Sequence, residues 1–230
     1  MLSVKNLTVE YTDGTRAVDS VSFSLEAGEN VGLIGANGAG KTSLLLALVG
    51  VLQAKRGEIY IEGALIEKKN MREARSRIGL VFQNPDDQLF MTSIFEDIAF
   101  GPRNYGHDEA ETNGRVGAAL ARLGIEHLEK RSPLKLSGGE KRLAAIATVL
   151  AMDPDFLLFD EPTAYLDPRA RRNLASILKD LPQGKLIATH DLAFVDEICP
   201  RVLLLQNGRL ISDGSGSLLH DAQKLESAGL

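Results

Sequence analysis

The sequence predicts an α/β fold with a mostly parallel sheet, an antiparallel β flank and an inserted helical subdomain. Short continuous apolar runs, typical of strands that are covered on both faces, alternate with helical periods along the chain. The N-terminal segments instead alternate apolar and polar side chains, and residues 90–150 contain helical periods only. With 230 residues and 44% hydrophobic composition, the chain is long enough to bury such a core.

The first elements are predicted to form an antiparallel hairpin with one solvated face. LSVKNLTVEY and VDSVSFSLEAGE both alternate, and Asp13-Gly14 between them provides the turn. The elements that follow are a buried strand over NVGLI, a helix over KTSLLLALVG and a strand over GEIYIEG.

Four later apolar runs predict the parallel strands of the core: RIGLVF, DFLLFDE, KLIATH and RVLLLQ. Three helical segments are expected between residues 90 and 154: IFEDIAF, EAETNGRVGAALARLG and GGEKRLAAIATVLAMDP. Gly114 and Gly117 weaken the middle one by about 1 kcal/mol each relative to Ala. Asn207–Arg209 predicts a late hairpin turn, and the DGSGS that follows leads to a short polar helix.

We therefore expect one domain over residues 1–230. In it, residues 1–89 and 151–214 form the α/β core with its β flank, residues 90–150 form the helical subdomain, and residues 215–230 form a short C-terminal tail. Ligands are expected at the carboxyl ends of the parallel strands.

Composition excludes several classes of protein. A net charge of −5 is opposite in sign to the positive charge that binds nucleic-acid backbones, so no nucleic-acid partner is expected. The single Cys199 excludes an internal disulfide, and the N-terminus has no signal-like character, which predicts a cytosolic chain. The longest apolar stretch, Leu44–Leu52, is shorter than the ~20 residues that span a bilayer. The 4 histidines are scattered, which argues against a transition-metal site made by the protein alone.

A phosphate-binding loop is predicted at GANGAGKT, which fits G-x-x-x-x-G-K-[ST]. Its glycines let backbone N–H groups approach phosphate, Lys41 neutralises phosphate charge, and the Thr42 hydroxyl can ligate Mg²⁺. The loop lies between a predicted strand and a predicted helix, whose N-terminal dipole also attracts phosphate. The expected nucleotide-binding residues are Gly35, Ala36, Asn37, Gly38, Ala39, Gly40, Lys41, Thr42 and Ser43. The alternative is a glycine loop that only turns a strand into a helix.

An acidic pair, Asp160-Glu161, ends the apolar run FLLF. At the end of a buried strand Asp160 can hold Mg²⁺ through water while Thr42 binds the ion directly, and Glu161 is the candidate catalytic base. The alternative is two solvated carboxylates that cap a strand. His190 follows LIAT at another strand end, where its imidazole could donate to a γ-phosphate and orient water.

A second anion site is predicted at LSGGE, Leu136–Glu140, where a serine and two glycines begin a helix. With this segment and the helix KRLAAIATVLA, the sequence resembles the ATP-binding cassette family from Leu2 to Gly214. The resemblance implies a P-loop NTPase (RecA-like) core that hydrolyses ATP with Mg²⁺. It implies roles for Tyr11 (stacking on adenine), Gln83 (sensing Mg²⁺ and the attacking water), Ser137, Gly138, Gly139 and Glu140 (the signature), and Asp167 and His190 (switch residues). For Tyr11, ordinary packing of an aromatic side chain that closes a strand is the alternative.

In that family two cassettes pack head to tail, and the signature of one covers the ATP held by the P-loop of the other. This geometry explains why one chain carries two phosphate-binding segments. Because this sequence has one cassette, the resemblance implies a second ATP-binding cassette chain as partner, either a copy of this chain or a paralogue.

FQNPDDQLF, from Phe82 to Phe90, and EDIAFGP, from Glu96 to Pro102, resemble the energy-coupling-factor ATPases of cobalt, nickel and vitamin uptake. This likeness implies an ATPase subunit that powers micronutrient uptake at the cytoplasmic face of the membrane, held there by an integral membrane component. It also implies a short helix after Gln83 and a docking surface at Gln88, Leu89 and Phe90 that receives an amphipathic helix of that component. The alternative is that Leu89 and Phe90 pack into the domain's own core.

Two departures from this branch stand out. Tyr165 replaces a residue that is commonly small and lies beside Asp167, where it bears on communication between the two nucleotide sites. Many relatives also carry a C-terminal extension that helps to hold the dimer, whereas this sequence stops soon after DGSGS, which argues against constitutive dimerisation by such an extension. The other readings are the ATPase of another importer or an exporter and, further away, a non-transport ATP-binding cassette protein.

Overall fold

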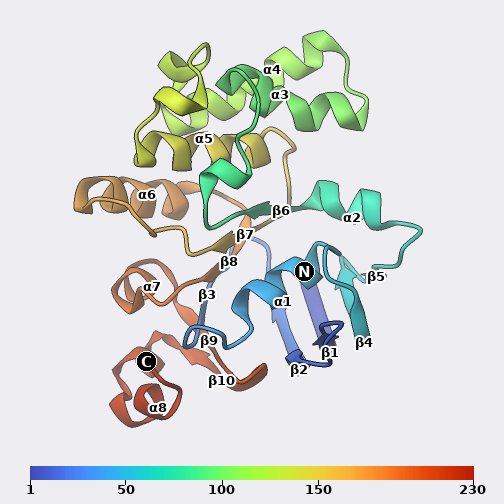
Figure 1. Ribbon diagram of the computed structural model, residues 1–230, viewed down its shortest axis with the longest axis vertical. Helices are drawn as coiled ribbons and strands as arrows, with labels where there is room; N and C mark the ends of the chain where they lie inside the picture. Colours follow the sequence, from blue (N-terminus) through green and yellow to red (C-terminus); the bar gives the residue numbers. More distant parts are fainter.

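The computed structural model describes residues 1–230 as two β-sheets and a layer of helices (Figure 1). The larger sheet has six strands in the order β10-β9-β3-β8-β7-β6, and all of its pairs are parallel except β10 with β9. Its strands are β3 (Asn30–Ile34), β6 (Ile78–Val81), β7 (Phe156–Asp160), β8 (Gly184–Ala188), β9 (Arg201–Gln206) and β10 (Arg209–Ser215). The predicted mostly parallel core sheet and the late hairpin turn are confirmed.

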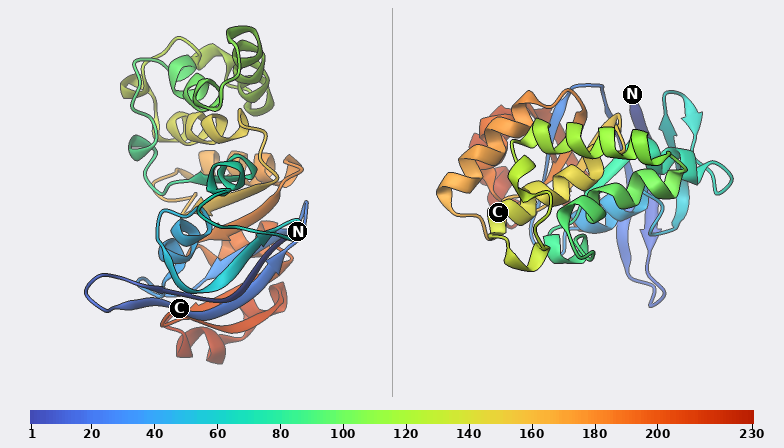
Figure 2. Two further views of the ribbon diagram at one scale, coloured as in Figure 1. Left: turned by 90° about the vertical axis from the view of Figure 1, so that its right-hand side faces the viewer. Right: turned by 90° about the horizontal axis from the view of Figure 1, so that it is seen from above.

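The second sheet is antiparallel and has four strands in the order β2-β1-β4-β5. Its strands are β1 (Leu2–Glu10), β2 (Arg16–Leu25), β4 (Ala54–Ile61) and β5 (Ala64–Leu65). β1 and β2 form the predicted hairpin, with Leu2 opposite Leu25. Its turn projects from the body of the molecule (Figure 2, left).

Helix α1 (Lys41–Leu48) lies between the two sheets and joins them into one core. Its Leu44, Leu45 and Leu48 are fully buried, and their cluster includes Leu7 of β1 and Leu33 of β3. Apolar surface on both sides of α1 is removed from water, and each Å² of it stabilises the fold by about 25 cal/mol. The helix that begins at the phosphate loop is therefore held by both sheets.

The helical layer occupies residues 94–150, between β6 and β7 of the chain, and contains no strand. It consists of α3 (Ile94–Tyr105), α4 (Glu109–Leu123) and α5 (Gly138–Leu150), which form the top layer in Figure 1 and in the left view of Figure 2. Helix α4 runs unbroken through Gly114 and Gly117, because its opposite face buries Val116 and Leu120. These two side chains belong to a second hydrophobic cluster, separate from the one around α1. The same cluster includes Phe159 of β7, so α4 and the large sheet share one core.

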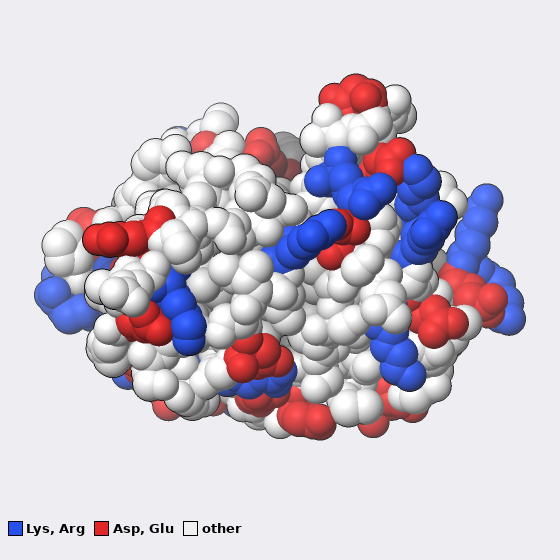
Figure 3. Space-filling view, turned by 90° about the horizontal axis from the view of Figure 1, so that it is seen from below, with Lys and Arg blue, Asp and Glu red and all other residues white.

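The remaining helices are α2 (Met71–Arg77), α6 (Pro168–Asp180), α7 (Leu192–Ile198) and α8 (Ala222–Ser227). None of the helices is both long and apolar enough to serve as a membrane span. On the face seen from below, acidic and basic side chains are interspersed (Figure 3).

Candidate functional site

The phosphate loop connects β3 to α1, and its shape is fixed by contacts with two other elements. Gly40 has φ +106°, and a Cβ there would lie 2.2 Å from the carbonyl oxygen of Ala17, so only glycine fits. The N–H of Gly208, in the β9–β10 turn, donates to the carbonyl oxygen of Ala39 over 2.9 Å. The N–H of Asp19, in β2, donates in turn to the carbonyl oxygen of Gly208 over 2.8 Å. The loop is thus braced before any phosphate binds.

Lys41 is the first residue of α1 and is almost completely buried. Its Nζ donates to the carbonyl oxygens of Gly35 over 2.7 Å and Ala36 over 3.3 Å, and lies 3.8 Å from Oε1 of Glu161. Burial lowers the pKa of Lys41, and the charge of Glu161 opposes that shift. The ammonium group is therefore held at the loop, beside the carboxylate predicted to act as base.

Thr42 and Asp160 meet across the site. The Thr42 hydroxyl donates to Oδ2 of Asp160 over 2.8 Å, whereas Oδ1 of Asp160 is buried without a hydrogen-bond partner. Burial raises the pKa of Asp160. A hydroxyl beside a carboxylate with a free acceptor oxygen fits Mg²⁺, which prefers oxygen ligands and takes the remainder from phosphates and water.

Glu161 directly follows β7, and its N–H donates to the carbonyl oxygen of Ala188 at the end of the neighbouring strand β8. The residue is buried, and its backbone lies in the left-handed region at φ +44°. Its Oε2 accepts from the Thr189 hydroxyl over 2.8 Å and from the backbone N–H of His190 over 3.3 Å. Nδ1 of His190 lies 3.0 Å from the same oxygen. Three groups at the end of β8 thus orient this carboxylate, and one of them, Thr189, was not predicted from the sequence.

One cavity of about 590 Å³ brings together most of the predicted nucleotide-site residues. It is lined by Tyr11, Asn37, Gly38, Ala39, Gly40, Lys41, Thr42, Ser43, Gln83, Glu161 and His190, and also by Thr15, Arg16, Ala17, Asn207 and Gly208. Tyr11 is partly exposed, and its hydroxyl lies 2.8 Å from Oγ of Ser43, so its ring is tied to α1 at the cavity wall. The last five residues were not predicted, because only the packing of two hairpins brings them to the loop.

The signature segment lies at a different cavity, of about 800 Å³, whose lining shares no residue with the first. Ser137 caps α5 in a capping box with Glu140, and both line this cavity together with Gly139 and Asp167. Asp167 caps α6, where the N–H groups of Ala170 and Arg169 hold the pKa of its carboxyl below the usual value. The predicted residues therefore form two separate groups within one chain.

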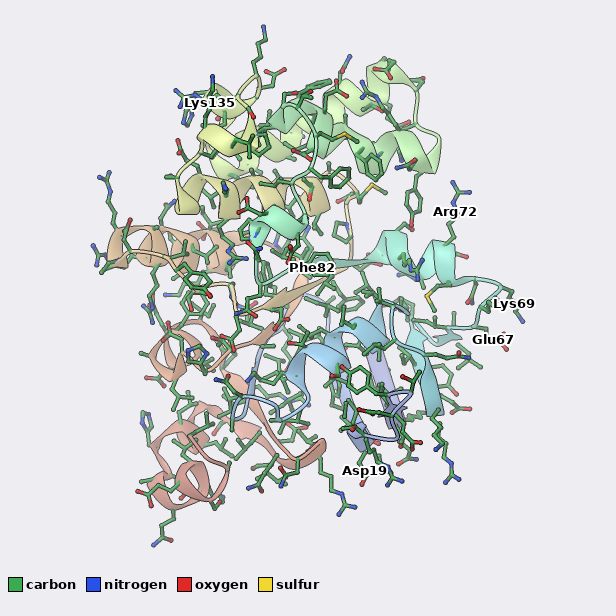
Figure 4. The ribbon with its side chains drawn as sticks, in the orientation of Figure 1. Asp19, Glu67, Lys69, Arg72, Phe82 and Lys135 are labelled. Carbon is green, nitrogen blue, oxygen red and sulfur yellow. The ribbon has the colours of Figure 1, made fainter.

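Arg142 of α5 connects these groups. Its guanidinium is 1% exposed and donates to the carbonyl oxygens of Phe82 over 2.7 Å and Gln83 over 2.6 Å. Burial lowers its pKa to about 10. Phe82 lies where β6 ends beneath the helical layer (Figure 4). Arg142 was not among the residues predicted from the sequence; the signal for it is a charged residue on the helix face that also carries the buried Ala145 and Ile146.

The predicted docking surface needs correction at Leu89, one of its three residues. The Gln88 amide points inward and donates to the Ala145 carbonyl oxygen over 2.9 Å and to Thr148 Oγ1 over 2.8 Å. Leu89 is buried in the core cluster, because the 3₁₀ turn over Pro85–Asp87 directs the following residues toward α5. Leu89 therefore offers no surface to a partner, and the alternative of core packing holds for it, whereas Gln88 is half-buried with its amide turned toward α5.

Phe90, by contrast, is 61% exposed and lies edge-on to the exposed Phe100, with ring centroids 5.1 Å apart. The buried carboxylate of Asp97 accepts from the N–H groups of Phe90 and Met91, each over 2.9 Å, and so fixes the backbone beneath the ring. Of the predicted docking residues, Phe90 is the one with an exposed side chain.

Comparisons with known proteins agree with this arrangement. The family described as ABC transporter matches residues 18–164. The energy-coupling factor transporter ATP-binding protein EcfA of Carboxydothermus hydrogenoformans is 45% identical over 232 residues, which cover 100% of this chain and 86% of that protein. The structure of CbiO1 from Clostridium perfringens, part of the ABC transporter complex CbiONQ, superposes with a TM-score of 0.85 at 36% identity and covers 98% of this chain and 93% of that one. A bacterial ABC transporter cassette with a dimeric structure superposes with a TM-score of 0.83 at 25% identity, covering 94% of this chain and 99% of that one.

Proposed function

The chain belongs to the ABC transporter family, as an ATP-binding subunit, and from that premise we propose that it is the ATP-hydrolysing subunit of an energy-coupling-factor type importer. Its cargo would be a micronutrient, a cobalt or nickel ion or a vitamin. The support for this branch is the likeness to EcfA over the whole chain and to CbiO1 of the CbiONQ complex. The proposed domain division keeps residues 90–150 as the helical subdomain that carries the signature, with residues 1–89 and 151–214 as the core and 215–230 as the tail.

Hydrolysis is supported by one observation above all: Lys41, Glu161 and His190 line a single cavity, next to the Thr42–Asp160 pair. In this proposal the loop N–H groups and Lys41 bind the phosphates. Glu161 accepts the proton of the attacking water, which His190 and Gln83 help to orient. Thr42, Asp160 and Gln83 would hold Mg²⁺, which neutralises phosphate charge when it is bound.

The separation of the two cavities supports a head-to-tail pair of cassettes. Ser137, Gly138, Gly139 and Glu140 lie at the start of α5, whose N-terminal dipole favours an anion, yet they are not at the cavity of their own P-loop. We propose that they cover the nucleotide of a second cassette and that Asp167 switches with the state of that nucleotide. A membrane component would hold the pair at the cytoplasmic face of the membrane, with Phe90 at the contact.

Glu161→Gln tests the proposed base. The variant should bind ATP but turn over at least ~10²-fold more slowly, because a positioned base contributes about 10²–10⁴-fold. Glu126→Gln, which removes an exposed carboxylate from a turn before the signature, is the matched control and should keep full turnover. Normal hydrolysis by Glu161→Gln in the assembled complex would remove Glu161 from the mechanism.

The head-to-tail pair is tested with the same Glu161→Gln variant, which should retain ATP. Light scattering should show a dimer with ATP and a monomer with ADP, because loss of the γ-phosphate removes the group that the two chains share. A monomer at saturating ATP, with a paralogue supplied as well, would contradict the pairing.

The transport branch is tested by purifying the chain from its membrane and identifying the proteins that accompany it. We expect integral membrane proteins, and we expect cells that carry them to take up radiolabelled cobalt, nickel or a vitamin in a manner that Glu161→Gln abolishes. Recovery with the membrane subunits of an exporter, or with no membrane protein, would argue for another branch.

A further inference from the structure

Arg171 forms a two-point ion pair with Asp191, the residue that follows His190. Its Nε donates to Oδ2 of Asp191 over 2.8 Å, and its Nη2 donates to Oδ1 over 3.1 Å. Both side chains are 24% exposed. Arg171 belongs to α6, and Asp191 caps the neighbouring helix α7 (Figure 1). Two parallel hydrogen bonds between a guanidinium and a carboxylate fix distance and angle together, so this pair holds Asp191 in one orientation.

Two further contacts hold the guanidinium of Arg171 in place. Its Cζ lies 5.2 Å from the centre of the ring of Phe194, which is fully buried, and its Nη1 lies 3.5 Å from Oε2 of Glu197. Both residues belong to α7. An aromatic face and a second carboxylate each favour the charged guanidinium at this position. Arg171 is thus fastened to α7 at three residues, and one of them, Asp191, adjoins His190 of the nucleotide cavity.

The backbone of Asp191 is bonded to the residues around the proposed base. Its N–H donates to Oγ1 of Thr189 over 3.1 Å, and the Thr189 hydroxyl donates to Oε2 of Glu161 over 2.8 Å. The side chain of His190, between these two residues, is 63% exposed. Because an exposed ring has few packing contacts of its own, its position depends on the backbone on either side. That backbone is fixed at Thr189 by the sheet and by the base, and at Asp191 by Arg171.

We propose that Arg171 is a positioning residue for His190: through its ion pair with Asp191, it holds the imidazole where it can orient the attacking water. The proposal rests on the role in ATP hydrolysis proposed above for His190 and adds the residue that sets the place of its ring. Arg171 does not itself line the nucleotide cavity, so it acts through Asp191 and not on the nucleotide. Since a displacement of about 1 Å can cost about 10²-fold in rate, a residue that only positions His190 can still control turnover.

Arg171→Met tests the proposal, because methionine keeps most of the length of the side chain and lacks the guanidinium. In the assembled complex kcat should fall about tenfold or more, as for a displaced catalytic group, whereas KM for ATP should change less than about twofold. Arg171→Lys keeps the charge but cannot make both bonds, so its kcat should lie between those of Arg171→Met and the wild type. Lys179→Met is the matched control: it removes another cation of α6 that pairs with Glu197, and it should leave kcat unchanged.

The decisive measurement repeats Arg171→Met in a His190→Ala background. His190→Ala alone should be slow, and adding Arg171→Met should lower kcat further by less than about twofold, because the group that Arg171 positions is already absent. A role in folding, or in holding Glu161, would instead lower kcat by the same factor in both backgrounds. Such an equal loss would overturn the proposal.

Asp191→Asn approaches the ion pair from its other side. Asparagine is a good helix cap, so α7 keeps its cap while the carboxylate is lost. We expect Asp191→Asn to lower kcat about as much as Arg171→Met does, and the double variant to be no slower than the slower single one, since the pair acts as a unit. Fully additive losses would contradict the pairing. If Arg171→Met does not fold, Arg171→Lys and Asp191→Asn carry the same comparison in the two backgrounds.

The outcomes separate this proposal from the role of His190 itself. If His190→Ala keeps full turnover, His190 has no part in hydrolysis and both statements fall. If His190→Ala is slow while Arg171→Met turns over normally, the role of His190 stands and the positioning role of Arg171 is rejected.

Discussion

The guanidinium of Arg142 donates to the carbonyl oxygen of Gln83 over 2.6 Å, so the helix that begins at the signature holds the backbone of a residue that lines the nucleotide cavity. The two residues are separated by 59 positions in the chain. A displacement of α5 would therefore move Gln83, and a displacement of Gln83 would be opposed by α5.

We predict that Arg142→Met lowers kcat for ATP hydrolysis more than it raises KM, because Gln83 loses its support while the phosphate loop is untouched. It should also lower the free energy of unfolding, since the variant loses two hydrogen bonds from a charged donor, each worth about 1.5–3 kcal/mol. Lys141→Met, which removes an exposed ion pair with Asp86 from the same helix, is the control and should change stability by less than about 1 kcal/mol. Steady-state kinetics and thermal melts check this; a rise in KM with unchanged kcat would contradict it.

Asp160→Asn should raise the melting temperature of the nucleotide-free protein at pH 7. Burial raises the pKa of Asp160 above 3.8, so the folded protein binds this proton more tightly than the unfolded chain. The stability contribution of Asp160 consequently falls as pH rises above 3.8 toward the folded pKa, and the full penalty applies above that folded pKa. Each tenfold change in proton affinity corresponds to about 1.4 kcal/mol.

The gain from Asp160→Asn should shrink as the pH is lowered through the folded pKa toward 3.8, where the wild-type carboxyl becomes protonated as well. The variant should also lose the extra stabilisation that Mg²⁺ adds to ATP, because Asp160 supplies a proposed ligand. Asp180→Asn, an exposed carboxylate at the end of α6, is the control. A lower melting temperature for Asp160→Asn at pH 7 would show that the carboxylate stabilises the apo protein.

Tyr11→Ala should weaken ATP binding about tenfold or more, since stacking of an aromatic side chain on a base is worth about 1–3 kcal/mol. Tyr11→Phe keeps the ring and loses only the contact with Ser43, so its affinity should lie close to that of the wild type. Calorimetric titration with ATP measures both. Equal affinity for all three proteins would support the alternative that Tyr11 serves packing alone.

Phe90→Ser should detach the chain from the membrane or abolish uptake while leaving its melting temperature nearly unchanged, because the ring is mostly exposed. Leu89→Ser is the contrasting variant: Leu89 is buried, and truncating a buried leucine costs about 2–5 kcal/mol, so this protein should melt earlier. Thermal melts and membrane co-sedimentation with the partners expressed distinguish the two. Normal uptake by a folded Phe90→Ser protein would reject Phe90 as a docking residue.

The sequence by itself determined the features that depend on neighbouring residues. Apolar runs predicted the buried strands β3, β7, β8 and β9, since a strand covered on both faces needs a continuous run. The phosphate loop is recognisable because its glycines allow the backbone to approach a phosphate closely, which is a local requirement. The start of α5 is equally local, because Ser137 and Glu140, which cap it, are three residues apart.

Only the tertiary structure decided which distant residues complete the site. Thr189 orients Glu161 because β7 and β8 are neighbours, the Asn207–Gly208 turn reaches the phosphate loop because β9 pairs with β3, and Arg142 reaches Gln83 because α5 packs over the end of β6. The same holds for the docking segment, where a 3₁₀ turn buries Leu89 and exposes Phe90 although both are large and apolar. Hydrophobicity determines that a side chain seeks burial, but the direction in which the backbone presents it depends on contacts that lie far away in the chain.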